Sequence, residues 1–250
     1  MQPLWWGYGG VPHLPLLAPQ DWGAGGLKEL FSGEGFLLKA DFHVHSKYSR
    51  DCNMTLEQIV RKCLDRGINC IALTDHGSAE GALRLQQIAP FTVIIGQEVL
   101  TPDGEIMGLF LKETVPSGLS PLEAAARIKQ QGGLVGVPHP FDSMRGLKMN
   151  SLESLVPQLD FLEVFNSRSL FRSNNSLAKR LVSQHGLLAT AGSDAHTPGE
   201  IGKAYVEMPE FTGKEDFKKS LAQGKIVGRR SSPLVHVSTT MANIKQHFKR

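Results

Sequence analysis

Two pairs of potential metal ligands are notable because the members of each pair are two residues apart. His43 and His45 end the run LLKADFHVH, and Asp194 and His196 end the run LLATAGSDAH. Residues two apart on an extended strand point to the same side, so each pair can face one cation. Mixed imidazole and carboxylate ligands suit divalent Zn, Mn or Fe. The two pairs therefore predict a site for divalent metal ions.

Four further residues of ligand type follow other strand-like runs. Asp75 and His76 come after INCIALT, Glu98 comes near the end of FTVIIGQEV, and His139 lies in LVGVPHP. Burying so many titratable side chains together would be costly without a metal. A lone histidine is more often an ordinary core or surface residue, and we expect this of the histidines that follow no strand, namely His13, His185, His236 and His247.

These residues need a scaffold that brings strand ends together. From Leu37 onward the chain alternates β-like runs with helical segments, and a capping box at Thr55 and Gln58 predicts one helix start. The turn signal Pro102-Asp103-Gly104 predicts a hairpin. Roughly six to eight such units favour an α/β fold of closed (β/α) barrel type, whose strand carboxyl ends meet at one face. The ligand-type side chains would converge there.

Domain organisation follows from the same pattern. Residues 1–36 are rich in Gly, Pro and Trp and lack periodicity, which predicts an irregular N-terminal extension. Residues 37–250 then form one domain, a length suited to a single barrel. No glycine-rich fingerprint follows the first strand, which argues against dinucleotide binding.

Charge and cysteine content limit the partners and the compartment. A net charge of +3 is too mild to indicate a stable nucleic-acid complex or an anionic membrane as partner. No run approaches ~18 apolar residues, so we expect neither a membrane span nor a signal peptide. The three cysteines, an odd number, are expected to be reduced thiols of a cytoplasmic protein. No pattern in the sequence predicts an oligomeric state.

Four polar residues near strand ends are further candidates for the site. Asp51 lies in the loop after the first strand, where aspartate is as often a turn former as a ligand. Arg145, Arg168 and Arg172 follow strand ends, where an arginine can bind a phosphate, although a solvated surface position is the better interpretation of Arg172. Arg145 is the best phosphate candidate because it comes soon after His139.

The motifs in their order resemble those of the polymerase and histidinol phosphatase (PHP) family. The matching segments are DFHVHSKYSRD, ALTDHG, GQEV, GVPHPFD, LEVFN and GSDAH, which lie between residues 41 and 196. The resemblance implies an irregular (β/α)7 barrel of TIM-like shape with up to three divalent metals at the strand ends. Members of that family are mainly phosphoesterases.

The resemblance also implies roles for individual residues. His43, His45, Glu98 and Asp194 would hold one metal, and Asp51, His76 and His196 would hold another. Glu98 would bridge to a third metal completed by His139, while Asp75 would orient a ligand. In that family a histidine is common where this chain has Met107, and a thioether is a poor ligand for Zn or Mn. The bridged site is therefore expected to be weak unless Asn166 contributes, and two metals are expected more firmly than three.

The activity implied is hydrolysis of phosphate esters by metal-activated water. His76 or His196 would protonate the leaving group, Arg145 would orient the phosphate, and Asp75 would support the site. The substrate is expected to be a small phosphorylated molecule, a nucleotide or a short oligonucleotide. Two alternatives stay open: an amidohydrolase that cleaves C–N bonds, since such barrels also begin with His-x-His, and a non-catalytic module stabilised by metal.

Overall fold

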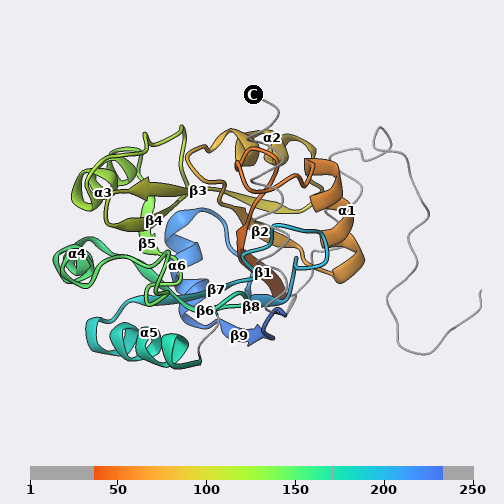
Figure 1. Ribbon diagram of the computed structural model, residues 1–250. Coiled ribbons are helices and arrows are strands. Elements are labelled where there is room, and N and C mark those ends of the chain that lie inside the picture. Colours follow the sequence, from red (N-terminus) through yellow and green to blue (C-terminus); the bar gives the residue numbers. More distant parts are fainter. Residues whose placement is uncertain (1–36, 170–171, 233–250) are drawn as a thin grey trace, which may run out of the picture.

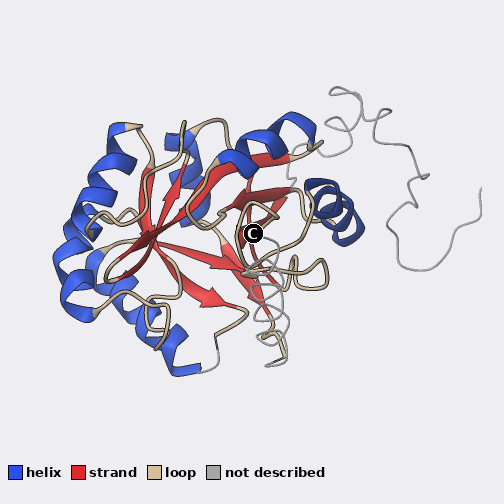
Figure 2. Ribbon diagram, turned by 45° about the horizontal axis from the view of Figure 1, so that its top comes forward, coloured by secondary structure: helices blue, strands red, loops and turns tan. Residues whose placement is uncertain are grey.

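Nine strands form one curved sheet in the computed structural model of the protein, which describes residues 37–169 and 172–232. The strands are β1 (Leu37–Val44), β2 (Cys70–Leu73), β3 (Thr92–Thr101), β4 (Gly104–Leu109), β5 (Leu134–Val137), β6 (Phe161–Asn166), β7 (Leu188–Gly192), β8 (Ala204–Pro209) and β9 (Lys225–Gly228). The helices are α1 (Leu56–Arg66), α2 (Glu80–Ile88), α3 (Pro121–Gln130), α4 (Met149–Leu155), α5 (Arg172–His185) and α6 (Lys214–Ala222). Their arrangement is shown in Figure 1, and Figure 2 shows most of the helices around the strands.

The sheet curves into a nearly closed barrel. Its order is β7-β6-β5-β4-β3-β2-β1-β8-β9, with β1 to β3 parallel, β5 to β7 parallel, and β4 antiparallel between the two sets. A parallel bridge between Val44 and Ala195 joins the end of β1 to the segment after β7. The His45 amide also donates to the Ala195 carbonyl at 2.9 Å. The predicted α/β barrel is confirmed, and β8 and β9 extend it as antiparallel strands beside β1.

Apolar side chains from all of the strands β1 to β8 fill the barrel interior. This core includes Ala40, Phe42, Ala72, Ile94, Met107, Leu109, Leu134, Phe161, Ala191 and Val206. Phe217 of α6 inserts into it and makes edge-to-face contacts with Phe42, Phe110 and Phe211 at centroid distances of 5.7, 4.9 and 5.1 Å. Helix α6 therefore closes the end of the barrel where the parallel strands begin, and leaves their carboxyl ends for polar side chains.

Local sequence signals set the helix boundaries. Thr55 and Gln58 form the expected capping box of α1, and Gly67 ends that helix with a φ of 64°, a conformation that favours glycine. Ser120 and Glu123 form a second capping box at α3. Among the helices of the described residues, none has both the length and the apolar character needed to cross a bilayer.

Two elements differ from the sequence expectation. Helix α4 was not predicted, because its seven residues are too few for a clear 3.6-residue period. Strand β9 was not predicted either, because two of its four residues are exposed and the other two are only partly buried, so they carry little hydrophobic signal. The predicted extension at residues 1–36 and the last residues of the predicted domain, 233–250, lie outside the described part of the chain.

Candidate metal centre

Ligand-type side chains gather where the parallel strands end. His43 lies in β1, and His45 lies just after it; Glu98 lies in β3. Asp194 and His196 follow β7, and His139 follows β5. The sequence-predicted residues that the barrel brings within reach of one another are His43, His45, Asp51, His76, Glu98, His139, Asp194 and His196. The predicted convergence is therefore present in the structure.

The two histidines of the first strand present the same ring nitrogen to each other. His43 Nε2 and His45 Nε2 lie 3.1 Å apart, and both side chains are fully buried. His43 Nδ1 donates to the Glu163 carboxylate at 3.0 Å, which leaves a lone pair on Nε2. His45 Nδ1 lies 3.1 Å from Ser49 Oγ, whose own proton goes to Asp75 at 3.0 Å. Ser49 therefore accepts from His45, and this Nε2 also keeps a lone pair.

Two carboxylates complete the surroundings of this histidine pair. Glu98 Oε2 lies 3.3 Å from both Nε2 atoms, and Asp194 Oδ1 lies 3.6 Å from His43 and 3.5 Å from His45. Neither oxygen has a hydrogen-bond donor. Two imidazole lone pairs and two carboxylate oxygens directed at one point suit a divalent cation.

The charges of these groups are strongly coupled. Burial alone would lower the pKa of His45, but its contacts with Asp194 and Glu98 raise it to about 10. Burial alone would raise the pKa of Asp194, yet Arg145 and His43 hold it well below its usual range. A positive charge is therefore favoured in the space between these side chains.

A second group lies beside the first. Asp51 Oδ2 is 3.1 Å from His196 Nε2 and 3.5 Å from His76 Nε2. His196 Nδ1 lies 2.9 Å from the Asp194 carbonyl and 2.5 Å from Arg168 Nη1. These contacts are alternatives, since the carbonyl needs a proton on Nδ1 and the guanidinium needs a lone pair. If His196 Nδ1 donates to the Asp194 carbonyl, His196 Nε2 keeps its lone pair and can bind a cation. Burial and the charge of His45 lower the pKa of His196 to about 4, so this ring is neutral near pH 7.

A third group includes a residue that the sequence did not single out. His139 Nε2 lies 3.1 Å from Glu98 Oε1 and 3.3 Å from Glu105 Oε2. Met107, expected at the ligand position of this strand, instead packs into the barrel interior with 1% of its surface exposed. Glu105 is two residues earlier and so faces the same side of β4. The strand therefore does supply a carboxylate to this group.

Unsatisfied buried polar atoms test whether this centre fits a metal. The side-chain atoms near the three groups that have no hydrogen-bond partner are Asp51 Oδ1, His76 Nδ1, Glu98 Oε2, Glu105 Oε2, His139 Nδ1 and Asp194 Oδ1. Buried polar atoms in native proteins are nearly always paired, so each such atom needs an explanation. Most of these are oxygen or nitrogen atoms of the kind that bind Zn, Mn or Fe. The residues present therefore fit divalent cations.

The backbone at two of these residues is strained. His139 and Asp194 have φ values of 26° and 53°, a region that residues other than glycine seldom adopt. Such strain persists only where the surrounding structure imposes it, and it clusters at functional sites. This backbone conformation directs the side chains of His139 and Asp194 toward the centre.

The comparisons with known proteins agree with this geometry. A family model described as a PHP domain matches residues 41–129, and a model described as PHP-associated matches residues 172–226. An uncharacterized protein of Methanocaldococcus jannaschii is 37% identical over 143 residues, which cover 52% of this chain and 82% of that protein. The chain belongs to the PHP family.

Solved structures show the same PHP fold. A two-domain protein of Bacteroides vulgatus, described as containing a predicted PHP-like metal-dependent phosphoesterase, matches with a TM-score of 0.63 and 19% identity, over 77% of this chain and 65% of that one. The lesion-specific endonuclease EndoQ of Pyrococcus furiosus matches with a TM-score of 0.61 and 19% identity, over 79% of this chain and 60% of that one. At this level of identity the likeness concerns the fold.

Two expectations concern residues beside the ligands. Asp75 accepts from the Ser46 amide and hydroxyl and from Ser49, so it acts on His45 through Ser49. The Asn166 side-chain oxygen accepts from the Arg168 amide at 2.8 Å, and its side-chain nitrogen donates to Glu163. A contribution of Asn166 to the bridged site stays a prediction.

The two arginines differ in exposure. Arg145 is partly exposed and donates to Asp194 Oδ2 at 2.6 Å and to Asp142 at 3.4 Å. Its position at the edge of the centre is compatible with the predicted contact to a phosphate. Arg168 is buried, with 3% of its surface exposed, and lies against His196. Binding of a phosphate by Arg168 stays a prediction.

Two buried acids support the centre and were missed by the sequence interpretation. Glu163 accepts from His43 Nδ1 with one oxygen and from the His139 amide, at 2.7 Å, with the other. Asp41 accepts from the amide and hydroxyl of Ser193, and burial raises its pKa to about 6. The signal for both was an acidic residue within an otherwise apolar strand, in FLEVFN and in LLKADFHV.

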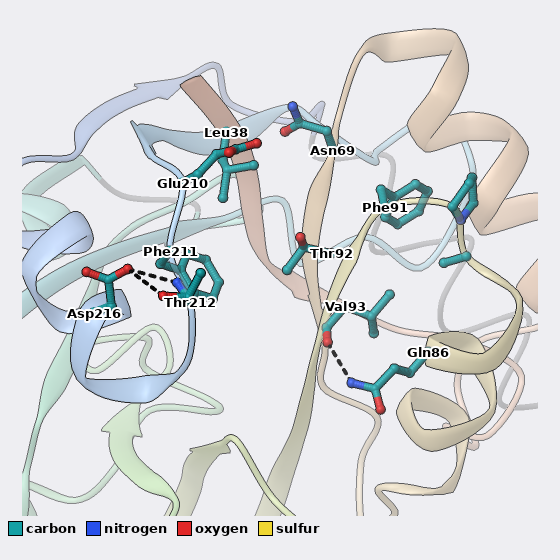
Figure 3. Close-up of a pocket in the computed structure, with 12 residues that line it drawn as sticks. Leu38, Asn69, Gln86, Phe91, Thr92, Val93, Glu210, Phe211, Thr212 and Asp216 are labelled. Atoms are coloured by element: carbon teal, nitrogen blue, oxygen red, sulfur yellow. Dashed lines mark hydrogen bonds between the residues drawn. The ribbon is translucent and has the colours of Figure 1, made fainter. Parts of the chain in front are cut away.

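A separate cavity of about 640 Å³ lies at the opposite end of the barrel. It is lined near the starts of the parallel strands by Leu38, Asn69 and Thr92, and Figure 3 shows Asp216 bonded to Thr212 beside it. The described residues that line it include no histidine or cysteine. The histidine ligand candidates therefore lie in the centre at the carboxyl ends of the parallel strands and not in this cavity.

Proposed function

We propose that this protein is a metal-dependent phosphoesterase that hydrolyses a small phosphorylated substrate at the centre described above. The observation that carries the proposal is the set of unpartnered buried atoms directed at shared points, above all Glu98 Oε2 and Asp194 Oδ1 between two histidines. Its identity as a PHP protein supports the same activity.

The ligand assignment follows the contacts. His43, His45, Glu98 and Asp194 would hold one cation. Asp51, His76 and His196 would hold another, and Glu98 would be shared with a third near His139. Bound divalent cations at such a centre activate water and neutralise charge on phosphate oxygens. Which of Zn, Mn or Fe is bound is decided by ligand type and availability more than by affinity alone.

The surrounding side chains would handle the substrate. Arg145 is the cationic group at the edge of the centre, so it would bind a phosphate oxygen and fix the orientation of the ester. His76 has 10% of its side-chain surface exposed, more than the 3% of His196. His76 is therefore better placed to meet a leaving group and to donate a proton to it.

The alternatives have less support from the described residues. Amidohydrolases commonly bridge two metals with a modified lysine, whereas here a glutamate, Glu98, lies between the candidate groups. A purely structural site needs only about four closed ligands. The centre contains more than twice that number of candidate ligands, and several of them are partly exposed.

The substrate class is a proposal as well. The mild net charge favours a small phosphate ester or nucleotide over a stably bound nucleic acid. EndoQ, which shares the fold, is described as a lesion-specific endonuclease, so a nucleic-acid substrate needs a direct test.

The test compares aryl phosphate monoester and diester hydrolysis by chelator-stripped protein, with and without added Mn²⁺ or Zn²⁺. Asp194→Asn removes one proposed ligand charge, and Asp65→Asn removes an exposed carboxylate of α1 as the matched control. We expect metal-restored turnover in the wild type and in the control, and a loss of at least about 100-fold in Asp194→Asn, since a bound metal supplies several kcal/mol. Metal binding without turnover on any ester would refute the proposal.

A further inference from the structure

Glu105 occupies an unusual position for an acid next to a tight turn. It lies in the second residue of β4, directly after the turn that joins β3 to β4, where glutamate is normally solvated. Here only 12% of its side-chain surface is exposed, and Oε2 is buried without a hydrogen-bond partner. The side chain is directed inward at the centre.

The neighbours of Glu105 are all ligand-type groups. Oε2 lies 3.3 Å from His139 Nε2, and Oε1 lies 3.6 Å from His76 Nδ1. One ligand atom each of His76, Glu98 and Glu105 lies within 4.8 Å of the others. Glu98 Oε2 is also unpartnered, and the Glu98 side chain is 1% exposed. A buried acid that points into this group is thus a second, independent indication of a cation.

Electrostatics favours a cation here over two bare carboxylates. Two ionised carboxylates at close range repel each other and cannot share a hydrogen bond. A divalent ion between the two acids would remove this cost and would also satisfy His139 Nε2.

We propose that Glu105 is a direct ligand of the third cation, which it shares with Glu98 and His139, and that this carboxylate replaces an imidazole ligand at the site. The proposal rests on the metal centre of the proposed function. It explains why Met107 can be a core residue without loss of the site. Because carboxylate oxygen suits Mn²⁺ and imidazole suits Zn²⁺, Glu105 makes this site more selective for Mn²⁺ than a histidine would.

The competing explanation is that Glu105 only orients His76 by accepting from its Nδ1. In that arrangement Glu105 would be a positioning residue for the cation held by Asp51, His76 and His196. Removing it would then weaken an existing site but would leave the number of bound cations unchanged. Stoichiometry therefore separates the two roles.

The test is equilibrium dialysis of the chelator-stripped full chain against Mn²⁺ and against Zn²⁺, with bound metal measured per chain. The variants are Glu105→Gln, Glu105→His and, as matched control, Glu113→Gln, which removes an exposed carboxylate from the loop after β4. Thermal unfolding of the metal-free proteins verifies that each variant is folded.

We expect Glu105→Gln to lose one equivalent of Mn²⁺ at concentrations that saturate the wild type, with at least about a 100-fold weaker affinity for that equivalent. Glu105→His should keep the stoichiometry and raise the Zn²⁺ to Mn²⁺ affinity ratio, and Glu113→Gln should match the wild type. An unchanged number of Mn²⁺ ions in Glu105→Gln would overturn the inference and leave the proposed function intact. A wild-type chain that binds neither metal would overturn the proposed function itself.

Discussion

His43 Nε2 and His45 Nε2 lie 3.1 Å apart in the interior of the barrel, and neither nitrogen has another donor to satisfy it. The Nδ1 protons of the two rings are directed away, to Glu163 and to Ser49. Two lone pairs at this distance repel each other unless a positive charge lies near both. That charge would be a proton in the metal-free protein and a cation in the proposed metal-loaded protein, so proton and metal would compete for the same position.

This competition predicts proton release on metal binding. In the metal-free protein the pKa of His45 is raised to about 10 from an ordinary 6.5, so the ring is charged at pH 7. Binding of Mn²⁺ or Zn²⁺ should release at least about one proton, and the apparent affinity should rise about tenfold per pH unit for each proton released. Calorimetry in two buffers of different ionisation enthalpy measures the number.

The raised pKa of His45 also determines how the stability of the metal-free protein changes with pH. The proton on His45 stabilises the metal-free fold fully below pH 6.5, and this contribution is lost as the pH rises through about 10. His185→Gln, a change of an exposed histidine of α5, should leave both effects unchanged. Metal binding with no buffer-dependent heat would contradict the prediction.

Ser49→Ala should weaken metal binding because it removes the contact that fixes the tautomer of His45. Loss of such a supporting hydrogen bond typically costs 10- to 100-fold in metal affinity. Ser46→Ala is the matched control. Ser46 Oγ also donates to Asp75, at 2.7 Å, but its other bond is to the Tyr48 amide and not to a histidine. Both variants should lose about 1–3 kcal/mol of unfolding free energy, measured in urea, since each leaves Asp75 short of a donor. Equal metal affinities in the two variants would show that Ser49 does not set the tautomer.

Gly192→Ala, a change in β7, should disturb His43 in the neighbouring strand β1. A Cβ at Gly192 would lie 2.2 Å from His43 Cβ and 2.9 Å from Glu163 Oε1, so one of the two must move. We expect a loss of about 1–3 kcal/mol in the free energy of unfolding, together with weaker metal binding. Gly199→Ala, where a Cβ meets nothing within 4 Å, serves as the control. Wild-type stability and metal affinity in Gly192→Ala would mean that the close approach to His43 is not needed.

Arg145→Lys should raise KM for a phosphate monoester by about tenfold with a smaller effect on kcat. Lysine keeps the charge but loses the planar pair of donors that fits a phosphate, and one such charge-assisted hydrogen bond contributes about 1.5–3 kcal/mol. Arg84→Lys, on the exposed face of α2, is the control. If kcat falls and KM stays constant, Arg145 acts on Asp194 and not on the substrate.

The histidine ligands could be predicted because each follows a buried strand, and the barrel then dictates where they meet. Glu105 could not be predicted in this way. It follows a turn signal, where acids are usually solvated, and only the antiparallel register that pairs Leu100 with Glu105 brings it to the rim of the barrel. Glu163 and Asp41 carried a signal, since an acid in an apolar strand is costly unless it is paired.

The bridge between Val44 and Ala195 has a consequence for how the centre comes into being. Every proposed cation site that includes Asp194 or His196 draws on both ends of a stretch of more than a hundred and forty residues, so no early segment of a growing chain holds it. A nascent chain therefore cannot bind metal at these complete sites until the segment after β7 has been synthesised and has paired with the end of β1. If the chain is divided into two fragments in the exposed loop at residues 112–114, neither fragment contains these complete sites. Mixing the two fragments should restore them, so metal binding would report closure of the barrel.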